Sequence, residues 1–151
     1  MQILTKQFGP ITFEEDAVLH FPDGLFGFEH LRRFLVIDQD EVEPLRWLQP
    51  IDDPAFAFPI IEPFLVWPDY RIKLMPADRE AMALGKVDPI VFALVTVPED
   101  PLKMTANLIG PLVIHPDRRF GMQVVLHDSG YTTRQRLIPD PAAESRDAAI
   151  V

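Results

Sequence analysis

Histidine and cysteine, the usual ligands of zinc, are few in this sequence, and the histidines are widely spaced. The four histidines are His20, His30, His115 and His127, and there is no cysteine. A zinc site needs several thiolate or imidazole ligands at short spacings, such as two histidines four residues apart on a helix. No such spacing occurs, so the sequence predicts no metal site.

A serine nucleophile or a catalytic carboxylate pair is equally poorly supported. Ser129 lies in the segment 127–130 (HDSG), which is typical of a turn between two strands, and no Gly-x-Ser-x-Gly elbow occurs. Acidic residues form two groups, one at positions 38–43 and the other the pair Asp52 and Asp53. Neither group lies in a markedly apolar stretch that would raise a pKa, so both are interpreted as solvated loops.

The glycines near the N-terminal third do not form a phosphate-binding loop. Gly24 and Gly27 lie in the segment 21–28 (FPDGLFGF), with no Lys-Ser or Lys-Thr pair after them. The Pro-Asp-Gly tripeptide is typical of a turn, and Gly27 allows a chain reversal where a side chain would not fit. We therefore expect no cofactor and no enzyme activity.

The charge of the chain restricts its partners. It has 14 basic and 23 acidic side chains among 151 residues, a formal net charge of −9. A surface of that sign repels nucleic-acid phosphates, so direct nucleic-acid binding is disfavoured. The same field favours a basic protein partner, although acidity that serves only solubility explains the charge as well.

The absence of cysteine excludes disulfide bonds and fits a reducing compartment. The first residues lack the basic patch and apolar run of a secretory signal, and later apolar runs are interrupted by proline or charge. We expect a cytoplasmic protein without a membrane-spanning segment, and a monomer when free.

The 16 prolines spread along the chain predict short strands rather than long helices. The fold class expected is mostly β, a compact antiparallel β-barrel of short strands with one or two short helices. One domain spans residues 1–138, and a flexible tail poor in large apolar side chains covers 139–151. Strands are predicted at 2–5, 17–21, 34–37, 46–48, 56–61, 70–74, 90–97, 112–115, 120–126 and 131–138. A helix is predicted at 76–84 with Gly85 as its left-handed cap, and one helical turn at 29–34.

Three segments in order resemble the FliW family of flagellar assembly factors. They are 21–29 (FPDGLFGFE), 47–58 (WLQPIDDPAFAF), and 107–111 (NLIGP) leading to 119–126 (RFGMQVVL). The resemblance covers residues 2 to about 138. Pro50 and Gly110 depart from the residues expected there, a small polar residue and alanine respectively, which affects only the local backbone.

The resemblance implies a compact antiparallel barrel that binds two protein partners in turn. One is flagellin, and the other is CsrA, a homodimeric RNA-binding translational regulator that represses the flagellin message. Flagellin that accumulates would occupy the factor and free CsrA. Export of flagellin would return the factor to CsrA and lift repression. The contact between the factor and CsrA need not cover the RNA site.

The alternative function is that of a small β-barrel module that binds a small ligand or an oligonucleotide. An acidic chain has the wrong charge for an oligonucleotide, which needs a positively charged groove.

The candidate partner-binding residues come first from the second segment. Trp47 and Gln49 are two apart on a predicted strand, so they share one face while Leu48 takes the other. If Leu48 faces the core, Trp47 is an outer-face anchor for a partner; the favoured interpretation is that Trp47 points inward, because large aromatics dominate cores. Asp52 and Asp53 could meet a basic partner, or Asp52 could cap the local turn.

Three further candidates lie near the C-terminal half. Asn107 is explained adequately by a turn in which its side chain bonds nearby backbone, with Pro111 beginning the next strand. Arg134 and Arg136 are two apart and would form a basic stripe on one face of the strand predicted at 131–138. That stripe could contact a partner, or act as a charged edge that discourages strand pairing by other chains.

Overall fold

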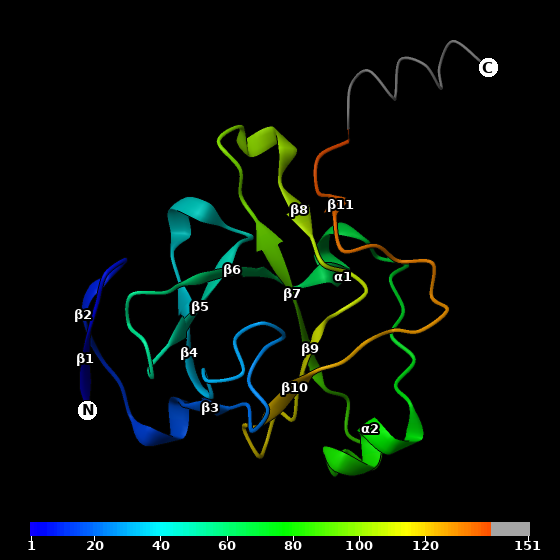
Figure 1. Ribbon diagram of the computed structural model, residues 1–151, viewed down its shortest axis with the longest axis horizontal. Coiled ribbons are helices and arrows are strands. Elements are labelled where there is room, and N and C mark those ends of the chain that lie inside the picture. The colour runs from blue at the N-terminus through cyan, green and yellow to red at the C-terminus, as the bar shows by residue number, and fades with distance from the viewer. Residues whose placement is uncertain (140–151) are drawn as a thin grey trace.

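The computed structural model describes residues 1–139, and short antiparallel strands account for most of its regular structure (Figure 1). The strands are β1 Gln2–Thr5, β2 Gly9–Thr12, β3 Leu19–His20, β4 Arg33–Asp38, β5 Arg46–Pro50, β6 Phe58–Ile61, β7 Ile90–Thr96, β8 Thr105–Ala106, β9 Leu112–Ile114, β10 Gly121–Gln123 and β11 Gln135–Arg136. The helices are α1 Pro63–Val66 and α2 Pro76–Ala81, with 3-10 turns η1 Glu15–Ala17, η2 Asp40–Val42 and η3 Pro101–Lys103. Both α-helices begin with proline, whose fixed φ suits a first helical position.

The strands form two sheets. One has nine strands, in the order β10-β9-β7-β6-β5-β4-β3, with β8 paired to β7 and β11 paired to β8. The other is the hairpin β1–β2, which lies at the left of the molecule in Figure 1. Every ladder is antiparallel, because most neighbouring strands follow one another along the chain through short connections.

The two ends of the nine-stranded sheet approach each other at one point. His20 and Phe120 form an isolated parallel bridge, and the His20 N–H donates to the Arg119 carbonyl at 2.9 Å. One bridge is not a continuous ladder, so no closed barrel is found among residues 1–139. The prediction of a mostly β, antiparallel fold with two short helices is confirmed, whereas closure into a barrel is not.

Both faces of the sheet are buried by apolar side chains. Adjacent residues of one strand point to opposite faces, so Ile60 and Phe92 belong to one core cluster while Ile61 and Ala93 belong to the other. The first cluster includes Leu48 and is closed by residues of the loop 21–32. The second is closed by the segment 70–84, which includes α2.

Several predicted elements are confirmed. Strands occur within or across the predicted ranges 2–5, 17–21, 34–37, 46–48, 56–61, 90–97, 112–115 and 120–126. The predicted helix at 76–84 is present as the shorter α2, which ends at Ala81 with Met82 as its C-cap. The left-handed residue that follows is Ala83, with a φ of 52°, so the prediction of Gly85 as the cap is wrong, although Gly85 also has a positive φ. The pattern did not predict β2, β8 or α1, which are too short to give a clear periodicity.

Three predicted elements are wrong. Residues 70–74 are not a strand, since the Arg71 N–H donates to the Tyr131 hydroxyl at 2.8 Å instead of to a neighbouring strand. Residues 29–34 contain no helical turn, because the chain enters β4 at Arg33. Of the strand predicted at 131–138 only β11 forms, and most of the tail predicted at 139–151 lies outside the described residues.

Candidate partner-binding surface

A loop at residues 21–32, called the central loop here, lies between β3 and β4. Its first turn closes through the Gly24 N–H, which donates to the Phe21 carbonyl at 2.9 Å, and Gly24 has a φ of 67°. Leu25 and Phe28 then pair in both directions across a two-residue reversal at which Gly27 has a φ of 84°. The turn predicted at residues 22–24 and the reversal predicted at Gly27 are therefore both confirmed.

The segment 47–58 meets the end of this loop through Asp52. One carboxylate oxygen accepts the backbone N–H groups of Arg32 and Arg33, each at 2.8 Å, and the other lies 3.3 Å from the Arg33 guanidinium nitrogen Nε. Partial burial opposes ionisation, but these hydrogen bonds outweigh it and lower the pKa of Asp52 below its ordinary value. Asp52 thus anchors the central loop across a distance of about twenty residues in sequence rather than capping its local turn.

The third segment holds the tip of the loop through Gln123. The Phe26 N–H donates to Gln123 Oε1 at 2.8 Å, and Gln123 Nε2 donates to the Gly110 carbonyl at 2.9 Å. The Gly110 N–H donates in turn to Asn107 Oδ1 at 2.9 Å, which confirms the predicted side-chain turn at Asn107. Both ends of the Gln123 amide are occupied, so this side chain, although buried, is satisfied.

An aromatic cluster forms where the central loop meets the segment 47–58. We define it as Phe28, Phe56 and Phe58, whose ring centroids lie 5.1 Å (Phe28 to Phe58), 5.6 Å (Phe28 to Phe56) and 6.2 Å (Phe56 to Phe58) apart. Phe56 is 39% exposed, and Phe26, in the same loop as Phe28, is 55% exposed. Exposed aromatic rings on a rigid support are the side chains that most often anchor protein partners.

Sequence reasoning missed this cluster although a signal was present. Phenylalanine occurs twice with one residue between, at 26 and 28 and again at 56 and 58. Each spacing is typical of side chains on one face of an extended chain. What the sequence could not supply was the contact of Phe28 with Phe56 and Phe58, from two loops that the Asp52 side chain links.

Trp47 lies on the face of β5 opposite to Leu48, which is fully buried in the first core cluster. The favoured inward interpretation of Trp47 is therefore wrong. Phe8, from the connection between β1 and β2, packs edge-on against the Trp47 ring at a centroid distance of 5.6 Å. The Trp47 Nε1 donates to Gln39 Oε1. Trp47 is thus an outer-face residue that the N-terminal hairpin half-covers.

Gln49 shares the face of Trp47 but is completely buried. Its Nε2 donates to the carbonyls of Pro50 and Phe56, each at 2.9 Å, which fixes the loop that carries Phe56. A partner could not reach Gln49 directly without displacing that loop.

The remaining candidates lie apart from the aromatic cluster or serve local turns. Asp53, not Asp52, caps the local turn by accepting the Ala55 N–H at 3.2 Å. Arg134 lies outside β11, so it does not share a strand face with Arg136 as predicted. Arg136 donates from Nη2 to the Leu102 carbonyl at 3.0 Å, whereas Arg134 is exposed.

No group of three or more His, Asp or Glu side chains among residues 1–139 is placed to hold a metal ion. Within the same residues no helix combines the length and the apolar character needed to cross a membrane.

Comparison with known proteins agrees with the convergence of the three segments on the central loop. The family profile described as FliW protein matches residues 2–137. The chain belongs to the FliW family. Gln123 joins the segment 119–126 to Phe26 of the segment 21–29, and the aromatic cluster joins the segment 47–58 to Phe28.

Relatives in the FliW family are similar over almost the whole chain. The flagellar assembly factor FliW of Moorella thermoacetica is 39% identical over 142 residues, which cover 93% of this chain and 90% of that protein. The one from Bdellovibrio bacteriovorus is also 39% identical, over 151 residues that cover 94% and 86%. A crystal structure of the flagellar assembly factor FliW superposes with a TM-score of 0.85 at 34% identity, and the match covers 93% of this chain and 99% of that one.

Proposed function

We propose that this chain works as a cytoplasmic flagellar assembly factor that binds flagellin and CsrA in turn. When flagellin occupies it, CsrA is free to repress the flagellin message; when flagellin is exported, the chain binds CsrA and relieves that repression. In this proposal the chain is a monomer when free, binds no nucleic acid and makes or breaks no covalent bond. The single observation that supports it most is the convergence of the three FliW segments on a rigid surface with exposed aromatic rings.

The aromatic cluster is the surface that we propose contacts a protein partner. Gln49 holds the Phe56 backbone, and Asp52 and Gln123 hold the central loop that carries Phe28, at Arg32 and at Phe26. Little conformational entropy therefore remains to be lost on binding. Arg33 and Asp52, which lie in the chain just after the central loop and just before Phe56, form a partly exposed ion pair of 3.3 Å. Aromatic anchors together with partly exposed charges are the arrangement expected of a specific protein interface.

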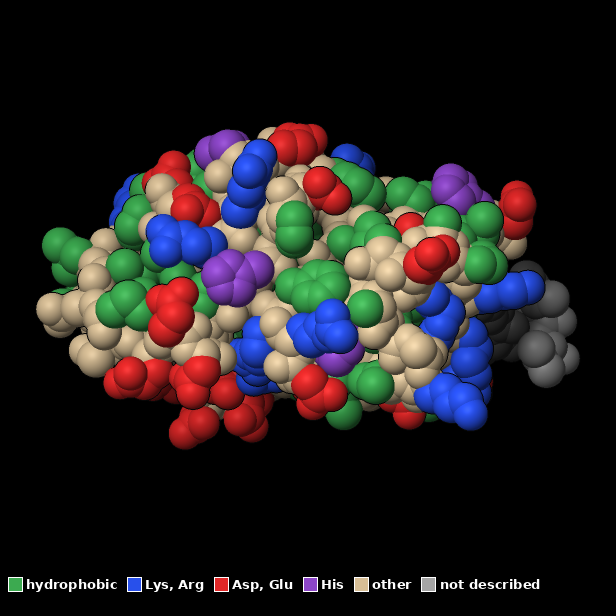
Figure 2. All heavy atoms as spheres, turned by 90° about the horizontal axis from the view of Figure 1, so that it is seen from below, with side chains coloured by type: hydrophobic (Ala, Val, Ile, Leu, Met, Phe, Trp, Pro, Cys, Tyr) green, Lys and Arg blue, Asp and Glu red, His purple; other side chains and the backbone are tan. Residues whose placement is uncertain are grey.

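The acidic surface supplies a second contribution to the proposed antagonism of CsrA. Exposed acidic residues follow one another at 14–16, around η1, and recur at 38–43, around η2. Figure 2 shows a group of acidic side chains at the lower edge of the half of the molecule that carries the β1–β2 hairpin. A group of lysine and arginine side chains lies at the lower edge toward the other end, and both kinds of charge also occur elsewhere on this face. Such a surface placed beside an RNA-binding protein would repel RNA phosphates without covering the RNA site.

The experiment that tests the partner switch is a competition titration with the full-length chain. Purified flagellin and purified CsrA from the same genome are each titrated against it by calorimetry, and each is then added to the preformed complex with the other. We expect both to bind and each to displace the other. Binding of neither partner would overturn the proposal, and simultaneous binding of both would overturn the switch.

The electrostatic part has its own test. The inhibition of RNA binding to CsrA by this chain is measured over a series of sodium chloride concentrations, with the stability of the protein complex measured in parallel. Screening shortens the range of the repulsion, so inhibition should fall as salt rises even where the two proteins remain bound. Unchanged inhibition across the series would show that the acidic surface is not the cause.

A further inference from the structure

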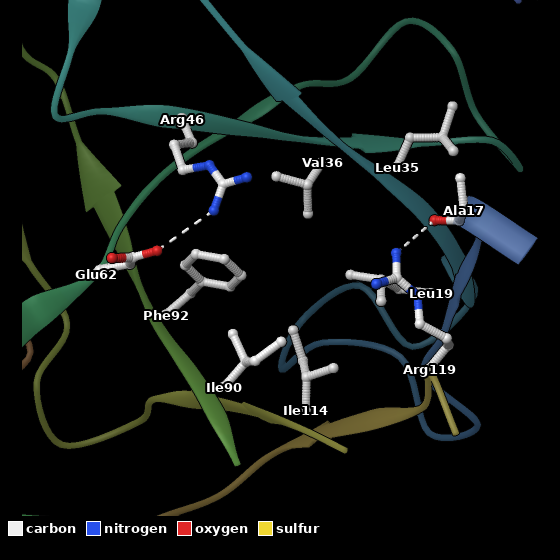
Figure 3. A pocket seen from close by; sticks show the side chains of 10 residues that line it. All are labelled: Ala17, Leu19, Leu35, Val36, Arg46, Glu62, Ile90, Phe92, Ile114 and Arg119. Atoms are coloured by element: carbon white, nitrogen blue, oxygen red, sulfur yellow. Dashed lines mark hydrogen bonds and ion pairs between the residues drawn. The ribbon is translucent and has the colours of Figure 1, made fainter. Parts of the chain in front are cut away.

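A cavity of about 310 Å³ lies on the Phe92 side of the nine-stranded sheet (Figure 3). Its wall combines apolar side chains with three charged ones, Arg46, Glu62 and Arg119. The apolar part includes Leu19, Val36, Ile90, Phe92 and Ile114, from β3, β4, β7 and β9. The volume is at the lower end of the range of small-molecule sites, which are also mainly apolar with a few polar groups. The cavity lies apart from the residues that define the aromatic cluster, since Phe28, Phe56 and Phe58 do not line it.

Arg46 is the first of two arginines that line this cavity, and its charge is already neutralised. It pairs with Asp38 and lies 3.4 Å from Glu62, measured from Nη1 to Oε1. Its guanidinium carbon also lies 5.4 Å from the centre of the Phe92 ring. These contacts fix Arg46 as part of the wall rather than as a free cation.

Arg119 enters the cavity from the other side, as Figure 3 shows. Its Nη2 donates to the Ala17 carbonyl at 3.0 Å, whereas Nε is buried and has no hydrogen-bond partner among residues 1–139. No carboxylate within those residues forms an ion pair with it. Its backbone has a φ of 57°, a conformation that is uncommon for a residue with a side chain and marks a position with a special constraint.

We propose that this cavity binds a small monocarboxylic acid, with the carboxylate on Arg119 and an apolar body against Leu19, Phe92 and Ile114. Of the charged side chains that line the cavity, Arg46 is paired with Glu62, whereas Arg119 has no carboxylate partner among residues 1–139. A carboxylate supplies one negative charge and acceptor oxygens for the guanidinium N–H groups of Arg119. A phosphate would instead place several polar oxygens against apolar walls, which is unfavourable.

The site is additional to the binding of protein partners proposed above and does not depend on it. The probe is hexanoate, which has one carboxylate and a short apolar chain. Its matched controls are hexanamide, which has the same shape without the charge, and hexylamine, which has the opposite charge. Binding is followed by chemical-shift changes in the ¹⁵N spectrum of the full chain.

We expect saturable binding of hexanoate, with the largest shifts at the cavity residues, and at least about tenfold weaker binding of hexanamide and hexylamine. Arg119→Gln should weaken hexanoate binding by a similar factor. Arg118→Gln, which removes a neighbouring exposed arginine, should leave it unchanged. Equal binding of hexanoate and hexanamide, or no binding of hexanoate to the folded wild-type chain, would overturn the proposal.

A second variant guards against a fold defect in Arg119→Gln. Ala17→Leu places more side chain at the cavity while retaining the carbonyl that Arg119 uses. It should weaken hexanoate binding without removing a charge, and unchanged binding would place the ligand elsewhere. If Arg119→Gln does not fold, the comparison of hexanoate with hexanamide on the wild-type chain still decides the question.

Discussion

Phe26 and Gln123, 97 residues apart in sequence, are joined by a hydrogen bond of 2.8 Å from the Phe26 N–H to the Gln123 side-chain oxygen. Since Gln123 also donates to the Gly110 carbonyl, it links the tip of the central loop to the segment before β9. The position of an exposed aromatic residue thus depends on a buried amide from a distant strand.

Replacement of Gln123 by leucine should destabilise the protein. The substitution leaves the Phe26 N–H and the Gly110 carbonyl without partners, at a cost of about 2–3 kcal/mol in the free energy of unfolding. Urea denaturation measures that energy, and amide exchange at Phe26 should become faster. Gln7→Leu, at an exposed position, is the control and should change stability by no more than about 0.5 kcal/mol. Equal stability of the two variants would contradict the assigned role.

Replacement of Asp52 by asparagine should change the pH dependence of stability. The pKa of Asp52 is lowered in the folded protein, so its contribution is present above the pKa of an unfolded aspartate, about 3.9, and is lost as the pH falls through the folded value. The variant should therefore be less stable near neutral pH, by about 1 kcal/mol given that the site is partly exposed, and should lose less stability on acidification.

Thermal denaturation between neutral and strongly acidic pH measures this difference. The control is Asp88→Asn, at an exposed aspartate outside the central loop. Parallel stability curves for Asp52→Asn and the wild-type chain would show that the carboxylate does not anchor the loop.

Alanine at Gly24 should be much more damaging than alanine at Gly27. Both glycines have a positive φ, so both substitutions carry the backbone strain of that conformation. A Cβ at Gly24 would also lie 2.6 Å from the Glu29 Cα, whereas nothing lies within 4 Å of one at Gly27. The free energy of unfolding should differ between the two variants by about 1–3 kcal/mol, measured by urea denaturation. A smaller penalty at Gly24 would mean that the central loop can rearrange.

Truncation of Phe56 to alanine should weaken binding of a protein partner with little effect on stability. The ring is 39% exposed, so its removal takes away interface area more than core packing. We expect at least about a tenfold loss of affinity for flagellin, for CsrA or for both in the calorimetric titrations. Phe64→Ala, at a ring of α1 that is 42% exposed, is the matched control and should bind normally. Unchanged affinity of Phe56→Ala for both partners would remove the aromatic cluster from the proposed function.

Local sequence alone determined most of the strands and several of the turns in this protein. Alternating apolar residues and frequent prolines predicted most strands. Both signals are local, because side chains alternate between the two faces of a strand from one residue to the next, and a proline without its N–H interrupts a helix within one turn. The Pro-Asp-Gly turn, the reversal at Gly27 and the Asn107 turn were predictable for the same reason. The three segments also indicated the family before any fold was known.

Tertiary structure decided which of those residues meet and which are accessible. Gln49 and Trp47 share a strand face, yet one is buried under the loop that carries Phe56 and the other is half-covered by the N-terminal hairpin. Residues 70–74 have the composition of a strand, but Arg71 donates to a tyrosine hydroxyl from a distant segment. The aromatic cluster and the arginine-lined cavity likewise consist of side chains from several elements. Such contacts depend on how the strands pair over long distances in the chain, which local periodicity does not specify.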